Sequence, residues 1–252
     1  MSTSLEGTTA LVTGASGGIG AATAVSLAAQ GANVALVARR KDRLDGVAEQ
    51  IRAAGGTALA VEADITDQAQ AAGAVEQAVQ AFGGLNTLVN NAGVMLLGPV
   101  ESAPVREWDR MIAINLLGLL YTTHAALPHL LAAAGTRGTA DVVNISSLAG
   151  RVPVAGSAVY SMTKQGVGAF SDALRQEVAG RHVRVSLVEP GPVATELFSH
   201  IRPEVLEAGK DDWAGATLLH AEDIADTITF VVTRPARVVM SELLVRPDGG
   251  QW

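Results

Sequence analysis

The sequence alternates short apolar runs with segments of helical length from one end to the other. Most of the runs are near-continuous in Val, Leu, Ile and Ala, which indicates strands buried on both faces. Strand–helix alternation of this kind predicts βαβ units and a parallel sheet covered by helices on both sides. We expect strands at Thr8–Thr13, Asn33–Ala38, Thr57–Val61, Leu85–Asn90, Ala140–Ser146, Val183–Val188 and Leu243–Arg246.

Between these strands, the helices should cover both faces of the sheet. They are expected at Ile19–Gln30, Lys41–Ala54, Asp67–Phe82, Trp108–Ala134, Ser157–Ala179 and Ala221–Thr233. Several stop at a glycine, the usual residue at a helix C-terminus: Gly31, Gly55, Gly83, Gly135 and Gly180. No polar linker interrupts the chain, so residues 1–252 are predicted to form a single domain.

One long connection, residues 191–220, breaks the rhythm and carries apolar side chains. A connection of this length with apolar content is typical of a lid over a site. A satellite packing cluster explains it equally well, and both interpretations stay open. Its apolar residues are Leu197, Phe198, Ile201, Leu206 and Trp213.

Composition excludes several classes of protein. Of the 252 residues 48% are hydrophobic and only 17% charged, which excludes disorder. The absence of cysteine excludes disulfides, thiolate metal sites and a cysteine nucleophile, and the five histidines show no metal-ligand spacing. A net charge of −7 argues against nucleic-acid binding.

No membrane span or export signal is expected either. The most apolar stretch, Met111 to Ala134, is interrupted by Asn115, His124, Pro128 and His129. The first residues, Met1 to Gly7, are polar, unlike a signal peptide. The chain is therefore predicted to be a soluble, cytoplasmic protein.

A glycine-rich loop, residues 13–20, follows the first strand and leads into the first helix. Gly14 permits a tight turn, Gly18 lets backbone N–H groups approach a pyrophosphate, and Gly20 lets helix and strand pack closely. The helix N-terminus then faces the anion with its partial positive charge. A glycine cluster alone is also compatible with plain turn chemistry, but its place between strand and helix favours dinucleotide binding.

The residues after the second strand indicate which dinucleotide is bound. An NAD-selective fold usually places an acid about 20 residues beyond the loop, whereas Ala38 stands there and Arg39 and Arg40 follow. Four of the eighteen Lys and Arg residues fall within positions 39–43. A 2′-phosphate explains this cluster better than a solvated helix start, where cations are unfavourable. We therefore predict NADP(H).

Tyr160 and Lys164 lie one helical turn apart, on one face of the predicted helix. A free phenol has a pKa of about 10, and a nearby ammonium favours the phenolate, so we expect Lys164 to lower the pKa of Tyr160. Such a phenol can donate or accept a proton near neutral pH. The pair is common on ordinary helices, and its significance depends on its neighbours.

Those neighbours all follow predicted strands at the edge of the sheet where an open parallel sheet binds its ligand. Ser147 ends the fifth strand, thirteen residues before Tyr160. Residues 90–93 end the fourth strand, and residues 190–195 follow the sixth.

At this point the chain, over essentially all of residues 5–250, resembles the short-chain dehydrogenase/reductase family. The resemblance rests on residues 13–20, Asp64, residues 90–93, Asn115, Ser147, Tyr160, Lys164 and residues 190–195. It implies a Rossmann-type, doubly wound, seven-stranded parallel sheet. It also implies a catalytic tetrad of Asn115, Ser147, Tyr160 and Lys164.

The roles that the resemblance implies are specific. Tyr160 would exchange a proton with the substrate oxygen, Ser147 would steady that oxygen, and Lys164 would hold the nicotinamide ribose. Asn115 would kink its helix and anchor a proton-relaying water; alone among apolar residues, its amide requires a partner. Motifs and resemblance together predict cofactor contacts from Gly14, Ser16, Gly17, Gly18, Ile19, Arg39, Arg40, Asp64, Ile65, Asn91, Ala92, Gly93, Tyr160, Lys164, Pro190, Gly191, Val193 and Thr195.

Within the family, residues 95–101 and Arg246–Pro247 look like the NADP-dependent clavulanic acid dehydrogenase group. An apolar substrate site is expected beside Ser147 and Tyr160, which suits a hydrophobic ketone, aldehyde or alcohol. Its predicted lining is Met95, Leu96, Leu97, Val154, Phe198, Ile201 and Trp213.

The prediction is thus an NADP(H)-dependent oxidoreductase that moves a hydride between nicotinamide and a carbonyl or alcohol. A non-catalytic dinucleotide-sensing protein is the alternative, and it has no need of the four residues of the tetrad together. The resemblance further implies a homotetramer or homodimer built through the two long helices. From charge and hydropathy we expect no nucleic-acid or membrane partner.

Overall fold

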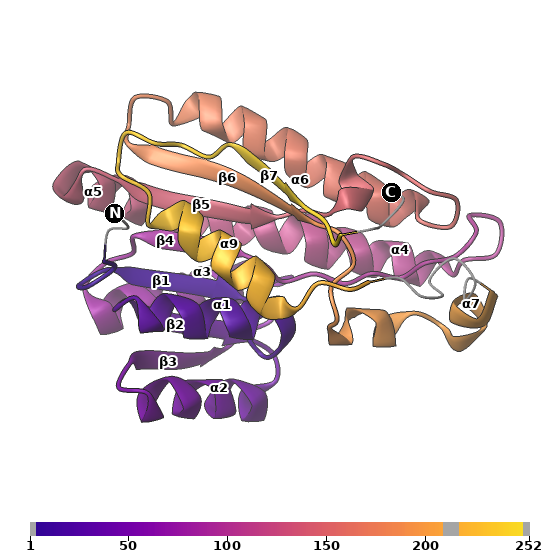
Figure 1. Ribbon diagram of the computed structural model, residues 1–252, viewed down its shortest axis with the longest axis horizontal. Helices are drawn as coiled ribbons and strands as arrows, with labels where there is room; N and C mark the ends of the chain where they lie inside the picture. Colours follow the sequence, from indigo (N-terminus) through magenta and orange to yellow (C-terminus); the bar gives the residue numbers. More distant parts are fainter. Residues whose placement is uncertain (1–3, 209–216, 249–252) are drawn as a thin grey trace.

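The structure, a computed structural model, describes residues 4–208 and 217–248. Its strands form one parallel sheet in the order β3-β2-β1-β4-β5-β6-β7, which confirms the predicted Rossmann-type architecture (Figure 1). The strands are β1 (Thr9–Thr13), β2 (Asn33–Ala38), β3 (Thr57–Glu62), β4 (Thr87–Asn90), β5 (Ala140–Ile145), β6 (Val183–Pro190) and β7 (Glu242–Val245).

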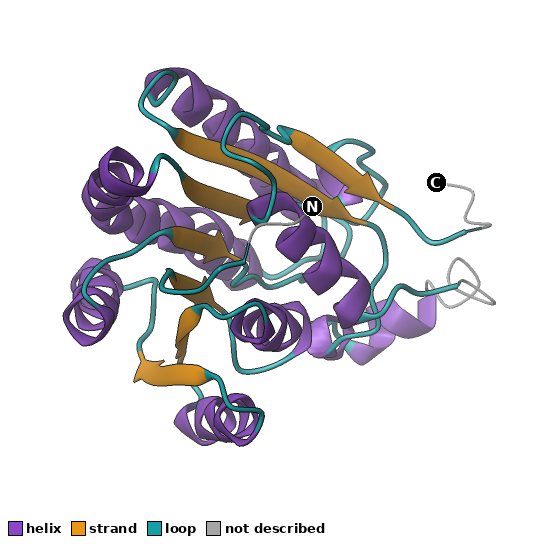
Figure 2. Ribbon diagram, turned by 60° about the vertical axis from the view of Figure 1, so that its left-hand side comes forward, coloured by secondary structure: helices purple, strands orange, loops and turns teal. Residues whose placement is uncertain are grey.

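Helices cover both faces of this sheet (Figure 2). One face packs on α1 (Gly18–Ala29), α2 (Lys41–Ala53) and α9 (Ala221–Val232). The other packs on α3 (Gln68–Phe82), α5 (Leu119–Arg137) and α6 (Ala158–Glu177). Strands β1, β4, β5 and β6 are buried along their whole length, as their apolar runs predicted, whereas the edge strands β3 and β7 are partly exposed.

The predicted helix Trp108–Ala134 is wrong in its bounds and its regularity. It divides into α4 (Val105–Ile112), a π-helical segment (Ala113–Gly118) and α5. The helix continues through Gly135 and stops at Gly138, which adopts the left-handed conformation with φ of 83°. By length and composition the helix Val105–Arg137 qualifies as a membrane span, but α5 packs in the core against α3 and the sheet.

The long connection after β6 contains structure that was not predicted. It includes a 3₁₀ turn (Glu196–His200) and α7 (Pro203–Ala208). A bridge between Val193 and Leu219 joins the two ends of the connection, so the chain leaves and returns at one place. Trp213 lies outside the described residues.

A buried ion pair holds the amino-terminal edge of the sheet, opposite the predicted site. Arg184 of β6 donates to both carboxylate oxygens of Asp141 on β5, at 2.7 and 2.8 Å. The same guanidinium donates to four backbone carbonyls, that of Val232 at the end of α9 and three in the segment that follows. This pair therefore joins two strands to the α9–β7 connection.

Candidate active site

A cavity of about 990 Å³ lies along the carboxyl ends of the strands. It passes the point between β1 and β4 where the strand order reverses, which is the usual ligand site of an open parallel sheet. All of the residues predicted to contact the cofactor line this cavity. So do Ser147, Met95, Leu97, Val154 and Phe198.

The glycine loop forms one wall, and its geometry requires glycine. Gly14 and Gly18 have φ of +67° and +52°, which L side chains rarely adopt. A Cβ on Gly20 would lie 2.4 Å from the carbonyl oxygen of Gly14. Helix α1 begins at Gly18 with no side-chain cap, and its first residues face the cavity. The first N–H groups of a helix have no carbonyl partner within it, so those at the start of α1 are suited to bind an anionic pyrophosphate.

Thr13 and Asn91 hold the loop against the end of β4. The Thr13 hydroxyl accepts hydrogen bonds from the backbone N–H groups of Asn91 and Ala92, at 3.0 and 3.1 Å. The Asn91 amide donates to the carbonyl of Thr13 at 3.0 Å. The side chain of Asn91, which the resemblance implied to be a cofactor contact, thus also positions the loop.

The basic cluster after β2 borders the same end of the cavity. Arg40 donates from Nε and Nη2 to Ser16 Oγ, at 3.3 and 3.1 Å. Its Nη1 donates to Glu196 Oε2 at 2.9 Å. Arg39 Nη1 lies 3.7 Å from Asp64 Oδ2. Burial opposes ionisation of Asp64, but hydrogen bonds from Thr66 and the charge of Arg39 hold its pKa below the ordinary value.

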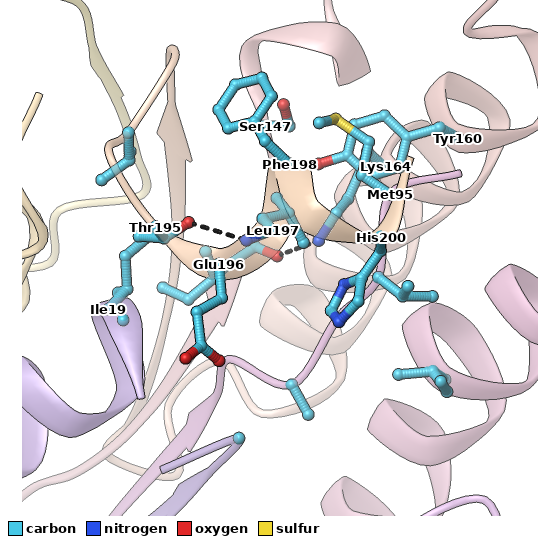
Figure 3. Close-up of a pocket in the computed structure, with 18 of the residues that line it drawn as sticks. Ile19, Met95, Ser147, Tyr160, Lys164, Thr195, Glu196, Leu197, Phe198 and His200 are labelled. Carbon is cyan, nitrogen blue, oxygen red and sulfur yellow. Dashed lines mark hydrogen bonds between the residues drawn. The ribbon is translucent and has the colours of Figure 1, made fainter. Parts of the chain in front are cut away.

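Three of the four predicted tetrad residues meet at the cavity, where Figure 3 shows Ser147, Tyr160 and Lys164 together. Ser147 follows β5, and the other two lie on α6. Tyr160 has a side-chain hydrogen bond with Ser147. Lys164 Nζ lies 5.9 Å from the centroid of the Tyr160 ring and donates to the carbonyl of Ile145 at 2.9 Å.

The prediction that Lys164 lowers the pKa of Tyr160 is wrong for this structure. Burial raises the pKa of Tyr160 to about 12, and the hydrogen bond with Ser147 only partly opposes this rise. Burial also lowers the pKa of Lys164 to about 8. Helical spacing placed the two side chains on one face, but the low polarity of their surroundings, which disfavours both charges, was not foreseen.

Asn115 does not line the cavity, although the resemblance placed it in the tetrad. It lies in the π-helical segment, and its amide is fully paired in the core. Its Oδ1 accepts from the N–H of Val94 at 2.8 Å, while its Nδ2 donates to the carbonyl of Val94 at 2.9 Å and to Thr163 Oγ1 at 3.1 Å. Asn115 thus ties the segment after β4 to the helix that carries Tyr160 and Lys164.

The apolar end of the cavity agrees only in part with the predicted substrate site. Leu96 and Ile201 do not line it, because their side chains form part of the buried core of the adjoining apolar cluster. The long connection contributes Leu197, Phe198, His200 and Val205 to this end of the cavity. Their position over the cavity favours the lid interpretation, while Ile201 supplies the packing cluster.

Several polar residues of this region were not predicted as site residues. Ser146 donates to the carbonyl of Lys164 at 2.9 Å, and Thr163 donates to the carbonyl of Tyr160 at 2.7 Å. Glu196 and Arg110 line the cavity. Ser146 and Thr163 adjoin predicted residues in sequence, and this adjacency was the available signal. Among described residues, no group of three or more His, Cys, Asp or Glu is placed to hold a metal ion.

Comparisons with known proteins agree with this geometry. The family described as short chain dehydrogenase matches residues 8–206. The diol dehydrogenase LinX of Sphingobium indicum, which acts on 2,5-dichloro-2,5-cyclohexadiene-1,4-diol by its name, is 36% identical over 100% of this chain and 98% of its own length. Glycine betaine reductase ATRR of Emericella nidulans is 40% identical over 96% of this chain, which spans only 19% of that protein.

Solved structures extend the match to the whole fold. A metagenomic short-chain oxidoreductase in complex with NADP has a TM-score of 0.81 and 36% identity, covering 97% of this chain and 99% of the other. A 3-ketoacyl-(acyl-carrier-protein) reductase of Brucella melitensis complexed with NADH has a TM-score of 0.85 and 33% identity, covering 96% and 98%. The narrower likeness to clavulanic acid dehydrogenases stays a prediction. With its family match, full-length relatives and fold in agreement, this chain belongs to the short-chain dehydrogenase family of oxidoreductases.

Proposed function

We propose that this protein is an NADP(H)-dependent oxidoreductase that interconverts a carbonyl compound and its alcohol. The observation that carries the proposal is the convergence of Ser147, Tyr160 and Lys164 on the cavity that the glycine loop borders. A nicotinamide cofactor bound there supplies or accepts the hydride. The chain supplies the binding surface, the orientation of the substrate and the proton.

The phosphorylated cofactor is favoured by charge. Arg39 and Arg40 line the nucleotide end of the cavity, and Arg40 together with Ser16 offers donors suited to a phosphate. One solved relative carries NADP and another NADH, so kinship alone does not decide between them. The preference for NADP(H) therefore rests on the arginines of this chain.

Tyr160 is the proposed proton donor for carbonyl reduction. With a pKa raised to about 12, its phenol is protonated throughout the neutral range, which is the form a general acid requires. Ser147, hydrogen-bonded to Tyr160, is placed to hold the same substrate oxygen. Lys164 offers a buried ammonium for the nucleotide ribose. Asn115 acts through Val94 and Thr163 as a positioning residue.

The substrate is proposed to be a fairly hydrophobic small molecule. Met95, Leu97, Val154 and Phe198 line the part of the cavity next to the proposed proton donor. Apolar pockets discriminate weakly by size, about 1–3 kcal/mol per methylene, so several carbonyl compounds should be accepted. A cytoplasmic location and assembly as a homotetramer or homodimer through α5 and α6 complete the proposal.

Replacing the proposed proton donor tests the reaction directly. Tyr160→Phe keeps the ring and removes the hydroxyl, and should lower kcat for NADPH-dependent carbonyl reduction by about 10²–10⁴-fold. The chain contains one other tyrosine, Tyr121, a half-buried residue of α5 outside the cavity lining, so Tyr121→Phe is a matched control.

The assay is oxidation of NADPH against a panel of aryl ketones, aldehydes and diketones, followed by absorbance. Near-full turnover by Tyr160→Phe would remove the proposed role of this residue. If the wild type turns over no compound of a broad panel but binds NADPH tightly, the non-catalytic sensor is the better description.

Cofactor preference has its own test. Arg39→Asp should raise the KM for NADPH far more than the KM for NADH, because it places a carboxylate where a 2′-phosphate is expected. Lys41→Asp makes the same change of charge two residues away, on a side chain that pairs with Asp45 and does not line the cavity. Equal effects of Arg39→Asp on both cofactors would overturn the proposed preference.

A further inference from the structure

Glu196, at the start of the long connection, reaches across the cleft to the basic cluster after β2. Its Oε2 accepts from Arg40 Nη1 at 2.9 Å, and its Oε1 lies 3.8 Å from Arg43 Nη1. Figure 3 shows its carboxylate pointing away from Ser147 and Tyr160. It points instead toward the glycine loop, since a Cβ built on Gly17 would lie 3.8 Å from Glu196 Oε2.

This carboxylate occupies the place from which a bound phosphate would accept hydrogen bonds from the basic cluster. Arg40 uses two of its nitrogens on Ser16 and the third on Glu196. Arg39 faces Asp64 at 3.7 Å. A phosphate that approaches Arg40 from the Nη1 side of its guanidinium therefore competes with an anion that belongs to the chain itself.

Glu196 is ionised and accessible, so the replacement is feasible. The hydrogen bond from Arg40 and the positive charge of that residue hold the pKa of Glu196 below its ordinary value. The side chains of Arg40 and Glu196 are 48% and 51% exposed. Exposed ion pairs are weak, so this one can be exchanged for a stronger phosphate contact.

The same residue begins the 3₁₀ turn that covers the substrate end of the cavity. Leu197, Phe198 and His200 of this turn line the cavity (Figure 3). Burial lowers the pKa of the His200 imidazole, and the positive charges of Arg110 and Arg40 lower it further. Movement of Glu196 away from Arg40 would therefore also move residues that face the substrate.

We propose that Glu196 is an internal competitor of the nucleotide 2′-phosphate for Arg40 and Arg43. It reduces the preference of the chain for phosphorylated nucleotides and holds the 3₁₀ turn over the cleft until such a nucleotide binds. This inference rests on the proposed function, because it assigns the basic cluster to a 2′-phosphate.

The affinity of nucleotide fragments tests the proposed competition by Glu196 without any need for turnover. Isothermal titration calorimetry would compare adenosine 2′,5′-bisphosphate with AMP on the wild type, Glu196→Gln and Glu204→Gln. Glu196→Gln keeps the size of the side chain and removes its charge. Glu204→Gln makes the same change on α7 of the same connection, where Glu204 pairs with Arg202 outside the cavity lining.

Glu196→Gln should bind the bisphosphate about two- to fivefold more tightly than the wild type, with AMP affinity unchanged. Glu204→Gln should bind both fragments as the wild type does. The gain should shrink as the salt concentration rises from 0.05 to about 0.5 M, because competition between exposed charges is screened.

Unchanged or weaker binding of the bisphosphate by Glu196→Gln would overturn the inference, as would an equal gain for AMP or no binding of the bisphosphate by either form. Failure of the proposed function looks different. In that case Glu196→Gln still gains affinity for the bisphosphate, but no carbonyl compound is turned over with NADPH. Normal turnover without the gain in affinity would reject only the role of Glu196.

Discussion

Asn115 is the residue through which the core positions the proposed active site, and its removal should have a calculable effect. Asn115→Leu preserves approximate volume and removes the amide. The N–H and carbonyl of Val94 then lose buried partners at 2.8 and 2.9 Å. Each orphaned group costs about 1–3 kcal/mol, so the free energy of unfolding should fall by about 2–6 kcal/mol.

This loss is large enough for thermal unfolding to detect. At about 2–4 °C per kcal/mol, Tm should fall by roughly 4–24 °C. Asn33→Leu, the same replacement at the half-buried start of β2, is the control and should shift Tm by no more than about 2 °C.

The folded fraction of Asn115→Leu should also be a poor enzyme. Val94 lies between Gly93 and Met95, which both line the cavity, and Thr163 lies next to Lys164. A displacement of about 1 Å lowers kcat by about 10²-fold, whereas the KM for NADPH should change much less, because the glycine loop is held separately by Thr13. If Asn115→Leu kept the wild-type Tm and kcat, the proposed role of Asn115 in holding the segment after β4 against α6 would be refuted.

The remaining predictions concern other parts of the molecule. Gly20→Ala should abolish nucleotide binding in calorimetry, because its Cβ would lie 2.4 Å from a carbonyl oxygen. Gly46→Ala, in open space on α2, is the control and should raise the free energy of unfolding by about 0.5–1 kcal/mol. Asp141→Asn should lower the free energy of unfolding in urea by about 3–5 kcal/mol by leaving Arg184 buried without its counter-ion, while folded enzyme keeps its kcat. Because the pKa of Lys164 is lowered to about 8, its charge is present below that pH and lost above it, so kcat/KM for reduction should fall above about pH 8; a rise between pH 7 and 9 would contradict this.

Much of the fold follows from local pattern. Near-continuous apolar runs predicted all seven strands, with ends within two residues of those observed. Strand ends also predicted the glycine loop, Ser147 and residues 190–195 at one edge, because parallel strands place their carboxyl ends together. The π-helical segment and the continuation of the helix past Gly135 were missed, since apolar composition does not distinguish these backbone states.

The chemical state of the site depended on tertiary structure. Helical spacing put Tyr160 and Lys164 on one face, but burial, which depends on distant segments, reversed the predicted direction of the Tyr160 pKa. The sequence indicated that Asn115 needs a partner, and only the fold supplied Val94. Glu196 and Arg40 are 156 positions apart, and their contact arises because the connection after β6 folds back to the residues after β2. Periodicity is a short-range property that determines elements and their order, whereas charges and dielectric surroundings are set by which surfaces meet once the sheet is complete.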